Sequence, residues 1–144
     1  GMSVHLGRYY FRKENHAAAA EAFAQTNPDN LSAKDKDAWL FEYGYSLFTQ
    51  RKLKEAKPLL DEVRRNASSP YYTDGNYYYG LLAYADGQYK EALACFDIAA
   101  LNAKYQPLTP YYNASIQYAL GNKDKGLELA ERALKSGNIL YTTE

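Results

Sequence analysis

Few residues of this sequence could perform catalysis or bind a metal ion. His5 and His16 are its only histidines and Cys95 is its only cysteine, so no histidine-rich or cysteine-based metal site is expected. Both histidines are predicted to lie at the surface, and Cys95 to be a small buried side chain on a helix. Asp61 and Glu62 are adjacent, and on a helix they would point in different directions. Neither a phosphate-binding glycine loop nor a nucleophile elbow is present. The sequence therefore predicts no catalytic residue, no cofactor and no metal site.

Charge and composition restrict the classes of partner. The 17 Lys and Arg residues balance 17 Asp and Glu residues, which argues against electrostatic capture of nucleic acid or of an anionic membrane. No apolar run approaches the ~20 residues needed to cross a bilayer, so no membrane insertion is expected. The unusual feature is the aromatic content of 16 Tyr, 5 Phe and 1 Trp. Tyrosine this abundant has to be explained by packing, by binding, or by both.

A repeat of 34 to 37 residues runs along the chain. The segment that begins Tyr79-Gly80 aligns with segments beginning Leu6-Gly7, Tyr43-Gly44 and Asn113-Ala114. Five columns agree: Gly7, Gly44, Gly80 and Ala114; Ala19, Ala56, Ala92 and Gly126; Phe23, Leu60, Phe96 and Ala130; Thr26, Val63, Ala99 and Ala133; Phe11, Phe48, Tyr84 and Tyr118. Small residues in two columns would let two helices cross closely, with a larger residue filling the space beside them. This agreement predicts a repeat protein.

Each copy is predicted to be a pair of helices, because its apolar residues recur with helical spacing. Gly87 and Gly121 mark tight turns within copies, and Pro28, Pro70 and Pro107 mark breaks between them. The predicted helices are 3–13, 16–27, 33–50, 53–66, 70–86, 89–102, 108–120 and 123–136. Since a lone hairpin cannot bury both faces, we expect an all-α, right-handed solenoid of about four hairpins. It would form one domain over 1–144, with repeats 2–31, 32–69, 70–106 and 107–140, and 141–144 as the opening of a further repeat.

The pattern resembles a known family. The small residue of each first helix, the turn at Gly87 and Tyr89, and Ala92 with Phe96 and Ala99 are similar to the tetratricopeptide repeat over nearly the whole chain. The resemblance implies a non-catalytic scaffold that binds a protein or peptide, with the first helices lining a concave docking surface. The tyrosine-rich sequence also resembles long repeat arrays of the bacterial cell envelope. That similarity implies an envelope or periplasmic location, although no targeting segment is visible. The opening of a further repeat at 141–144 and the lack of a cap on the last helix indicate a fragment of a longer array.

The predicted binding residues lie on this first-helix face. They are Phe41, Tyr45, Phe48, Tyr77, Tyr84, Tyr111, Ser115 and Tyr118, with Leu81 beside them. Either these side chains line an exposed groove, or they pack helix against helix along the array. Exposure is expected for Phe41, Tyr45, Tyr77 and Tyr111; packing is expected for Phe48, Tyr84 and Tyr118, whose column is aromatic in every copy. Arg8 and Arg12 are expected on a solvated face and not in a clamp for a peptide carboxylate.

The fourth copy departs from the pattern in two ways. Asn113 and Gln117 occupy columns that are otherwise mostly apolar, and buried amides need hydrogen-bond partners. Leu127, Leu129 and Leu134 of the last helix have no obvious cover, although the terminal repeats of a solenoid usually need a polar cap. A homodimer through this uncapped repeat is therefore a further expectation. The alternative function is a structural spacer or self-association module of a larger protein.

Overall fold

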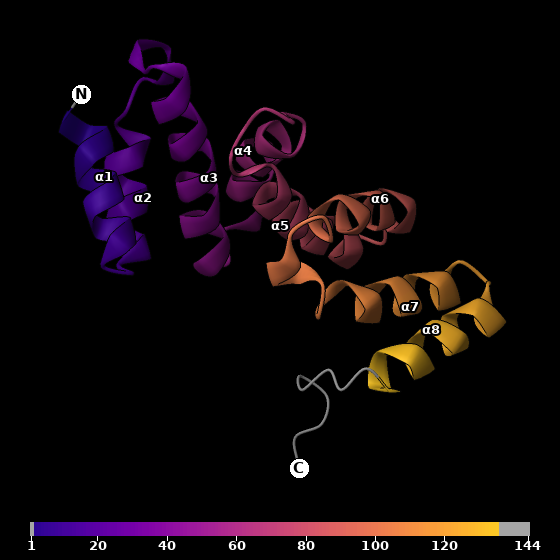
Figure 1. Ribbon diagram of the computed structural model, residues 1–144. Coiled ribbons are helices and arrows are strands. Elements are labelled where there is room, and N and C mark those ends of the chain that lie inside the picture. The colour runs from indigo at the N-terminus through magenta and orange to yellow at the C-terminus, as the bar shows by residue number, and fades with distance from the viewer. Residues whose placement is uncertain (1, 136–144) are drawn as a thin grey trace. The chain divides into compact units, whose positions relative to one another are not determined.

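A computed structural model describes residues 2–135 of the protein, and this part of the chain contains helices and no strand. The eight α-helices are α1 (Met2–Arg12), α2 (His16–Ala24), α3 (Ala33–Thr49), α4 (Leu53–Arg64), α5 (Tyr72–Ala85), α6 (Tyr89–Ala99), α7 (Thr109–Ala119) and α8 (Lys123–Lys135) (Figure 1). Two short 3-10 helices, Pro28–Asn30 and Ala103–Tyr105, join hairpins. The all-α prediction is confirmed, although several predicted helices extend up to three residues too far. Position 136 and the further repeat expected at 141–144 lie outside the described residues.

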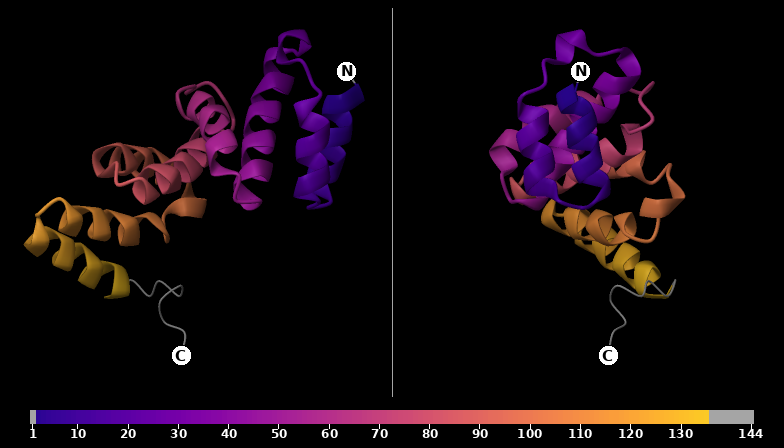
Figure 2. Two further views of the ribbon diagram at one scale, coloured as in Figure 1. Left: turned by 180° about the vertical axis from the view of Figure 1, so that it is seen from behind. Right: turned by 90° about the vertical axis from the view of Figure 1, so that its left-hand side faces the viewer.

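The chain packs as two compact units, Gly1–Tyr78 and Tyr79–Glu144, and the boundary falls inside α5. In the first unit α1 packs on α2, α2 on α3 and α3 on α4. In the second unit α6 packs on α7 and α7 on α8. Figures 1 and 2 show the paired helices lying side by side. Neighbours in sequence are thus neighbours in space, as in a series of helical hairpins. One domain over 1–144 stays a prediction.

The four hairpin turns share one backbone geometry. Each contains a residue with positive φ: Glu14 (59°), Arg51 (65°), Gly87 (75°) and Gly121 (94°). The next residue donates a backbone hydrogen bond to the carbonyl five residues earlier: Asn15 to Tyr10, Lys52 to Leu47, Gln88 to Ala83 and Asn122 to Gln117, at 2.8–2.9 Å. A left-handed residue with such a bond ends a helix in a Schellman motif. These turns recur at the same intervals as the sequence columns. The backbone geometry is therefore evidence for the repeat that does not depend on side-chain similarity.

The two small-residue columns lie where the helices of each hairpin cross. An added Cβ would lie 2.5 Å from Phe23 at Gly7, 3.0 Å from Leu60 at Gly44 and 2.8 Å from Phe96 at Gly80. The three facing side chains, Phe23, Leu60 and Phe96, are completely buried. A side chain at any of these glycines would have to displace a core residue, and the predicted close crossing is confirmed.

The fourth hairpin reaches the same close crossing with the roles reversed. Ala114 stands in α7 and the glycine, Gly126, in α8, where an added Cβ would lie 2.9 Å from the Ala114 carbonyl oxygen. Ala130 occupies the column of Phe23, Leu60 and Phe96 and is only half-buried. No large side chain therefore fills the space beside this crossing.

Other expectations about buried groups are also tested. Cys95 is buried on α6, as predicted. Gln117 accepts a 2.9 Å hydrogen bond from Asn122 Nδ2, as burial requires. The Asn113 side chain hydrogen-bonds to Asp97, but its buried Oδ1 atom has no hydrogen-bond partner. Among residues 2–135, no helix combines the length and the apolar character needed to cross a membrane.

Candidate binding groove

The residues predicted to bind a partner belong to a triplet of positions that recurs in each first helix, three residues before, one after and four after the small column. The triplets are Val4, Arg8 and Phe11 in α1; Phe41, Tyr45 and Phe48 in α3; Tyr77, Leu81 and Tyr84 in α5; and Tyr111, Ser115 and Tyr118 in α7. A second column, two residues before the small one, contains Glu42 in α3, Tyr78 in α5 and Tyr112 in α7. We call these three the inserted residues, because each contacts the triplet of the preceding first helix.

The α3 triplet packs around Tyr78. The ring centroid of Tyr78 lies 6.2 Å from that of Phe41, 5.0 Å from that of Tyr45 and 5.3 Å from that of Phe48. Burial, and a hydrogen bond with Tyr45, raise the pKa of Tyr78 above its usual range. Phe41 also stacks on Tyr71 at 5.2 Å and is only 8% exposed. The exposure predicted for Phe41 is wrong, and Tyr45 is half-buried; the packing expected for Phe48 agrees with this contact.

The aromatic members of the α5 triplet are also covered. Tyr77 is 8% exposed, and its ring centroid lies 5.1 Å from that of Tyr78, so its predicted exposure is wrong. Tyr84 is half-buried and lies 5.8 Å from Tyr89 and 5.6 Å from Tyr112, between ring centroids. Tyr84 therefore packs against its neighbours, as expected for this column.

The α1 triplet makes the same contact with charge in place of aromatic rings. Arg8 donates hydrogen bonds from Nε to Glu42 Oε1 at 3.1 Å and from Nη2 to Oε2 at 3.3 Å. Glu42 is 7% exposed, and its burial raises the pKa of the carboxyl group despite these bonds. A buried carboxylate depends on such a partner, so the prediction of a solvated role for Arg8 is wrong. Glu42 was missed, although a signal existed: it shares a column with Tyr78 and Tyr112.

The two histidines differ in their surroundings. His5 is exposed, as predicted. His16 is half-buried, and its ring centroid lies 5.6 Å from that of Phe11 and 5.4 Å from that of Tyr45. The surface position predicted for His16 is therefore wrong. Of residues 2–135, no three His, Cys, Asp or Glu side chains are grouped as a metal site.

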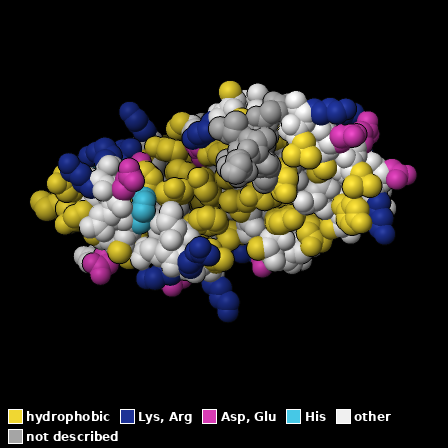
Figure 3. Space-filling view, turned by 90° about the horizontal axis from the view of Figure 1, so that it is seen from below, with side chains coloured by type: hydrophobic (Ala, Val, Ile, Leu, Met, Phe, Trp, Pro, Cys, Tyr) yellow, Lys and Arg dark blue, Asp and Glu magenta, His cyan; other side chains and the backbone are white. Residues whose placement is uncertain are grey.

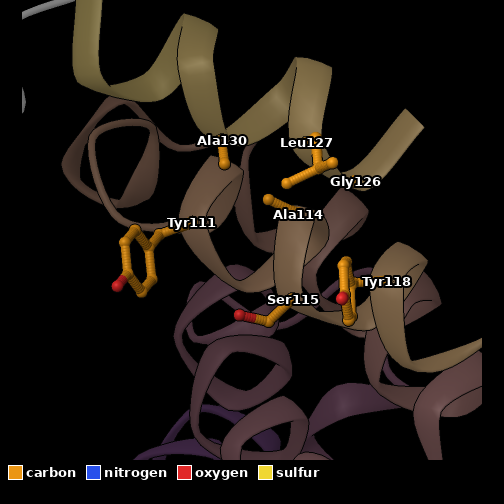
Figure 4. Close-up of a pocket in the computed structure, with 7 residues that line it drawn as sticks. All are labelled: Tyr111, Ala114, Ser115, Tyr118, Gly126, Leu127 and Ala130. Carbon is orange, nitrogen blue, oxygen red and sulfur yellow. The ribbon is translucent and has the colours of Figure 1, made fainter. Parts of the chain in front are cut away.

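The α7 triplet differs from the other three because it lines an open groove. Tyr111 is 36% exposed and Tyr118 49% exposed, and Ser115 is half-buried. The exposure predicted for Tyr111 is confirmed, whereas the packing predicted for Tyr118 is wrong. A cavity of about 190 Å³ lies between α7 and α8, lined by Tyr111, Ala114, Ser115, Tyr118, Gly126, Leu127 and Ala130 (Figure 4). We call it the α7–α8 groove.

The groove is open because of one column of the sequence. In the first and third copies a phenylalanine stands in this column and meets an aromatic ring of the next first helix: Phe23 lies 5.9 Å from Tyr43, and Phe96 stacks on Tyr112 at 4.9 Å. Ala130 leaves that space free. The groove walls are mainly apolar and include the hydroxyl groups of two tyrosines and one serine. Figure 3 shows one face of the protein, on which many hydrophobic side chains are exposed.

Acidic side chains of α8 lie in a hollow that shares Leu127 and Ala130 with the groove. This hollow is lined by Leu127, Ala130 and Leu134 together with the acidic Asp124, Glu128 and Glu131. Leu127 is 59% exposed and Leu134 is 53% exposed. Glu128 is paired with Arg132 at 2.9 Å, and Lys123 Nζ lies 5.8 Å from the ring centroid of Tyr118, so α8 carries charges of both signs.

No known family model, curated protein or solved structure matches the chain. The class of protein is therefore defined by its own structure, as an all-α protein whose consecutive helices pack as hairpins.

Proposed function

We propose that the protein is a tetratricopeptide-like, right-handed array of helical hairpins that acts, without catalysis, as a protein-binding scaffold. Its binding site is the α7–α8 groove, which takes an apolar or aromatic side chain from a helix or peptide of a partner. One observation carries the proposal. The triplets of α1, α3 and α5 each contact an inserted residue of the next first helix, whereas the α7 triplet lines the α7–α8 groove, where Tyr118 is 49% exposed.

The chemistry of the groove supports this function. Tyr111 and Tyr118 present exposed rings, and tyrosine contributes a large contact area at low entropy cost with a polar group for orientation. Burying one aromatic side chain of the partner there would contribute about 1.5–3 kcal/mol. The α3 triplet gives an internal example of the proposed contact, because it surrounds the ring of Tyr78.

Selection from a displayed library of natural peptides tests the proposal. Binding of the enriched peptides is measured by fluorescence polarisation with the wild-type chain and with Ser115→Trp, which fills the groove. We expect Ser115→Trp to weaken binding at least tenfold. Leu101→Ala is the matched control, because Leu101 is 74% exposed and lines neither groove nor hollow. Peptides that bind Ser115→Trp as well as wild type would contradict the site, and robust turnover by the purified chain would contradict the non-catalytic role.

A further inference from the structure

The turn between α3 and α4 contains three residues that each lower local stability. Arg51 has a φ of 65°, a left-handed backbone that favours glycine, and the third and fourth copies have glycine at this position. Lys52 is the N-cap residue of α4 and makes no capping hydrogen bond with its side chain, whereas the other three copies have Asn or Gln there. Lys54 is the second residue of α4. Cations at 52 and 54 lie beside the positive end of the helix dipole, which is unfavourable.

No contact within the described residues compensates for these three side chains. Arg51, Lys52 and Lys54 are all exposed, and among residues 2–135 none of them pairs with a carboxylate. The α1–α2 turn also has a non-glycine residue at positive φ, Glu14, but the side chain of Asn15 caps the helix that follows. Residues that lower local stability without a compensating contact are typical of functional surfaces.

A further lysine lies beside this turn. Gln50 Nε2 donates a 3.3 Å hydrogen bond to the His16 carbonyl oxygen, which joins the α3–α4 turn to the start of α2. Lys13, in the α1–α2 turn, is exposed, and its Nζ lies 5.7 Å from the Tyr9 ring. In Figure 1 the α1–α2 turn and the end of α3 both point downward, and dark blue Lys and Arg side chains project from the left-hand part of Figure 3, which is seen from below. The surface that we call the basic turn edge consists of Lys13, Arg51, Lys52, Leu53 and Lys54.

The basic turn edge is a local excess of positive charge in a chain that is neutral overall. Residues 12–16 and 50–57 contain six Lys and Arg residues and two Glu residues. Two of these cations are not counted in the surface. Arg12 acts on the buried Glu42 carboxyl group, whose pKa it lowers, and Lys57 is half-buried. The balance of charge over the whole sequence therefore does not describe this end of the first unit.

We propose that the basic turn edge docks an acidic segment of a protein partner, with carboxylates beside Arg51, Lys52 and Lys54 and an apolar residue against Leu53. Leu53 is 39% exposed and stands between the two lysines. Carboxylates at this place would offset the unfavourable interaction of the lysines with the helix dipole, and attraction between opposite charges speeds the encounter. The surface belongs to the first unit, so this inference does not rest on the α7–α8 groove of the second.

Three features favour an acidic protein segment over a nucleic acid or a membrane. The basic turn edge has no aromatic side chain on which a base could stack. Leu53 is its single apolar side chain, which is too little for insertion into a bilayer. The exposed Glu14 and Glu55 lie among the cations, and a closely spaced row of phosphates would meet them. The carboxylates of a peptide can be spaced to avoid them.

Variants that remove positive charge while improving the local fold test the surface. Arg51→Gly supplies the residue that the backbone favours, Lys52→Asn supplies a helix cap, and Lys54→Glu suits the helix dipole, so all three should melt at or above the wild-type temperature. The probe is a fluorescein-labelled peptide in which a central leucine is flanked on each side by four glutamates, followed by fluorescence polarisation in about 50 mM salt. Arg51→Gly and Lys52→Asn should each weaken its binding about threefold, and Lys54→Glu, which reverses a charge, about fivefold.

Lys90→Glu is the matched control for Lys54→Glu. Lys90 aligns with Lys54, is exposed, and is likewise the second residue of its helix, α6, so the changes in net charge and in dipole interaction are the same. Lys90→Glu should leave the affinity for the peptide unchanged. Equal losses in the two variants would show that the peptide responds only to net charge, and would overturn the proposal. A wild-type chain that does not bind the peptide at about 1 mM would overturn it as well.

Two other probes decide the class of partner, namely a DNA duplex and phosphatidylcholine vesicles with about 30% phosphatidylserine. Tighter binding of either probe than of the peptide, lost in Lys54→Glu and kept in Lys90→Glu, would overturn the assignment to a protein segment. Ser115→Trp fills the α7–α8 groove and should not change binding of the acidic peptide, so failure of this inference and failure of the proposed function are distinguishable. A loss of peptide binding in Ser115→Trp would place the peptide in the groove and overturn the inference.

Discussion

Replacing Gly7 with alanine separates close packing from helix propensity, because the two effects have opposite signs. In a solvent-exposed helix, alanine is more stabilising than glycine by about 1 kcal/mol. At Gly7 the added methyl carbon would lie 2.5 Å from Cδ1 and Cε1 of Phe23, whose ring is completely buried and cannot move away freely. Overpacking a filled core costs about 1–3 kcal/mol, and so short a contact belongs at the upper end. The expected net loss of unfolding free energy is therefore about 1–2 kcal/mol.

Urea denaturation followed by tryptophan fluorescence measures this loss. Trp39 is the only tryptophan, and it hydrogen-bonds to the Phe23 carbonyl, so its signal reports on the unit that contains Gly7. Gly44→Ala is the graded control, because its methyl would lie 3.0 Å from Leu60, a more flexible side chain; its effect should be close to zero. Phe23→Leu should reduce the cost of Gly7→Ala. If Gly7→Ala were as stable as wild type or more so, helix propensity would dominate and the close-crossing argument would be refuted.

Three further predictions concern the turns and the inserted residues. Arg51 has φ 65°, so Arg51→Gly should stabilise the protein by about 0.5–1 kcal/mol. Gly87→Ala should destabilise it by about 1 kcal/mol because of backbone strain alone, since the added methyl group meets nothing within 4 Å. Thermal melts measure both effects, and the reverse signs would contradict the shared turn geometry. Arg8→Leu should cost about 2–3 kcal/mol at pH 7, because it leaves the buried Glu42 carboxylate unpaired. Burial raises the folded-state pKa of Glu42, so ionisation of this carboxyl group opposes folding. The free-energy cost of Arg8→Leu should therefore shrink as the pH falls through that pKa. An equal cost at pH 7 and pH 4, measured by urea denaturation, would contradict the unpaired carboxylate as its cause. Burial also raises the pKa of Tyr78 above its ordinary value of 10.0, so the protein loses stability as the pH rises past 10. Tyr78→Phe should move the alkaline unfolding midpoint, followed by Trp39 fluorescence, to higher pH. An unchanged midpoint would exclude Tyr78 as the cause of alkaline unfolding.

The sequence was informative where a residue type is required by local geometry. A close helix crossing excludes bulk whatever surrounds it, so the glycines at 7, 44 and 80 could be assigned to the crossings without coordinates. Gly87 and Gly121 identified two of the four turns for a similar reason. The other two turns place Glu14 and Arg51 at positive φ, and only alignment with the glycine-containing copies could have revealed them.

The α7–α8 groove could not be assigned from the sequence, because exposure of a triplet depends on what packs against it. Phe41 and Tyr111 occupy the same column, yet Phe41 is 8% exposed and Tyr111 is 36% exposed. The difference arises from a residue far along the chain, since Tyr78 completes the packing around the α3 triplet. Arg8 and Glu42 illustrate the same limit: their pairing depends on contact between α1 and α3, and single-helix reasoning placed Arg8 on a solvated face.

The contacts between successive first helices use one geometry and several chemistries, and this variety bears on specificity. The α1 triplet offers a guanidinium to a carboxylate, whereas the α3 triplet offers a tyrosine hydroxyl and aromatic rings to a tyrosine. Exchanging the inserted residues would be unfavourable, because Glu42 would lose its cation and Arg8 would face an aromatic ring without a carboxylate. The α7 triplet, with Ser115 at its centre, has no charge to offer an inserted acid. A face that presents a carboxylate in the place of Glu42 would therefore find no partner cation within that triplet.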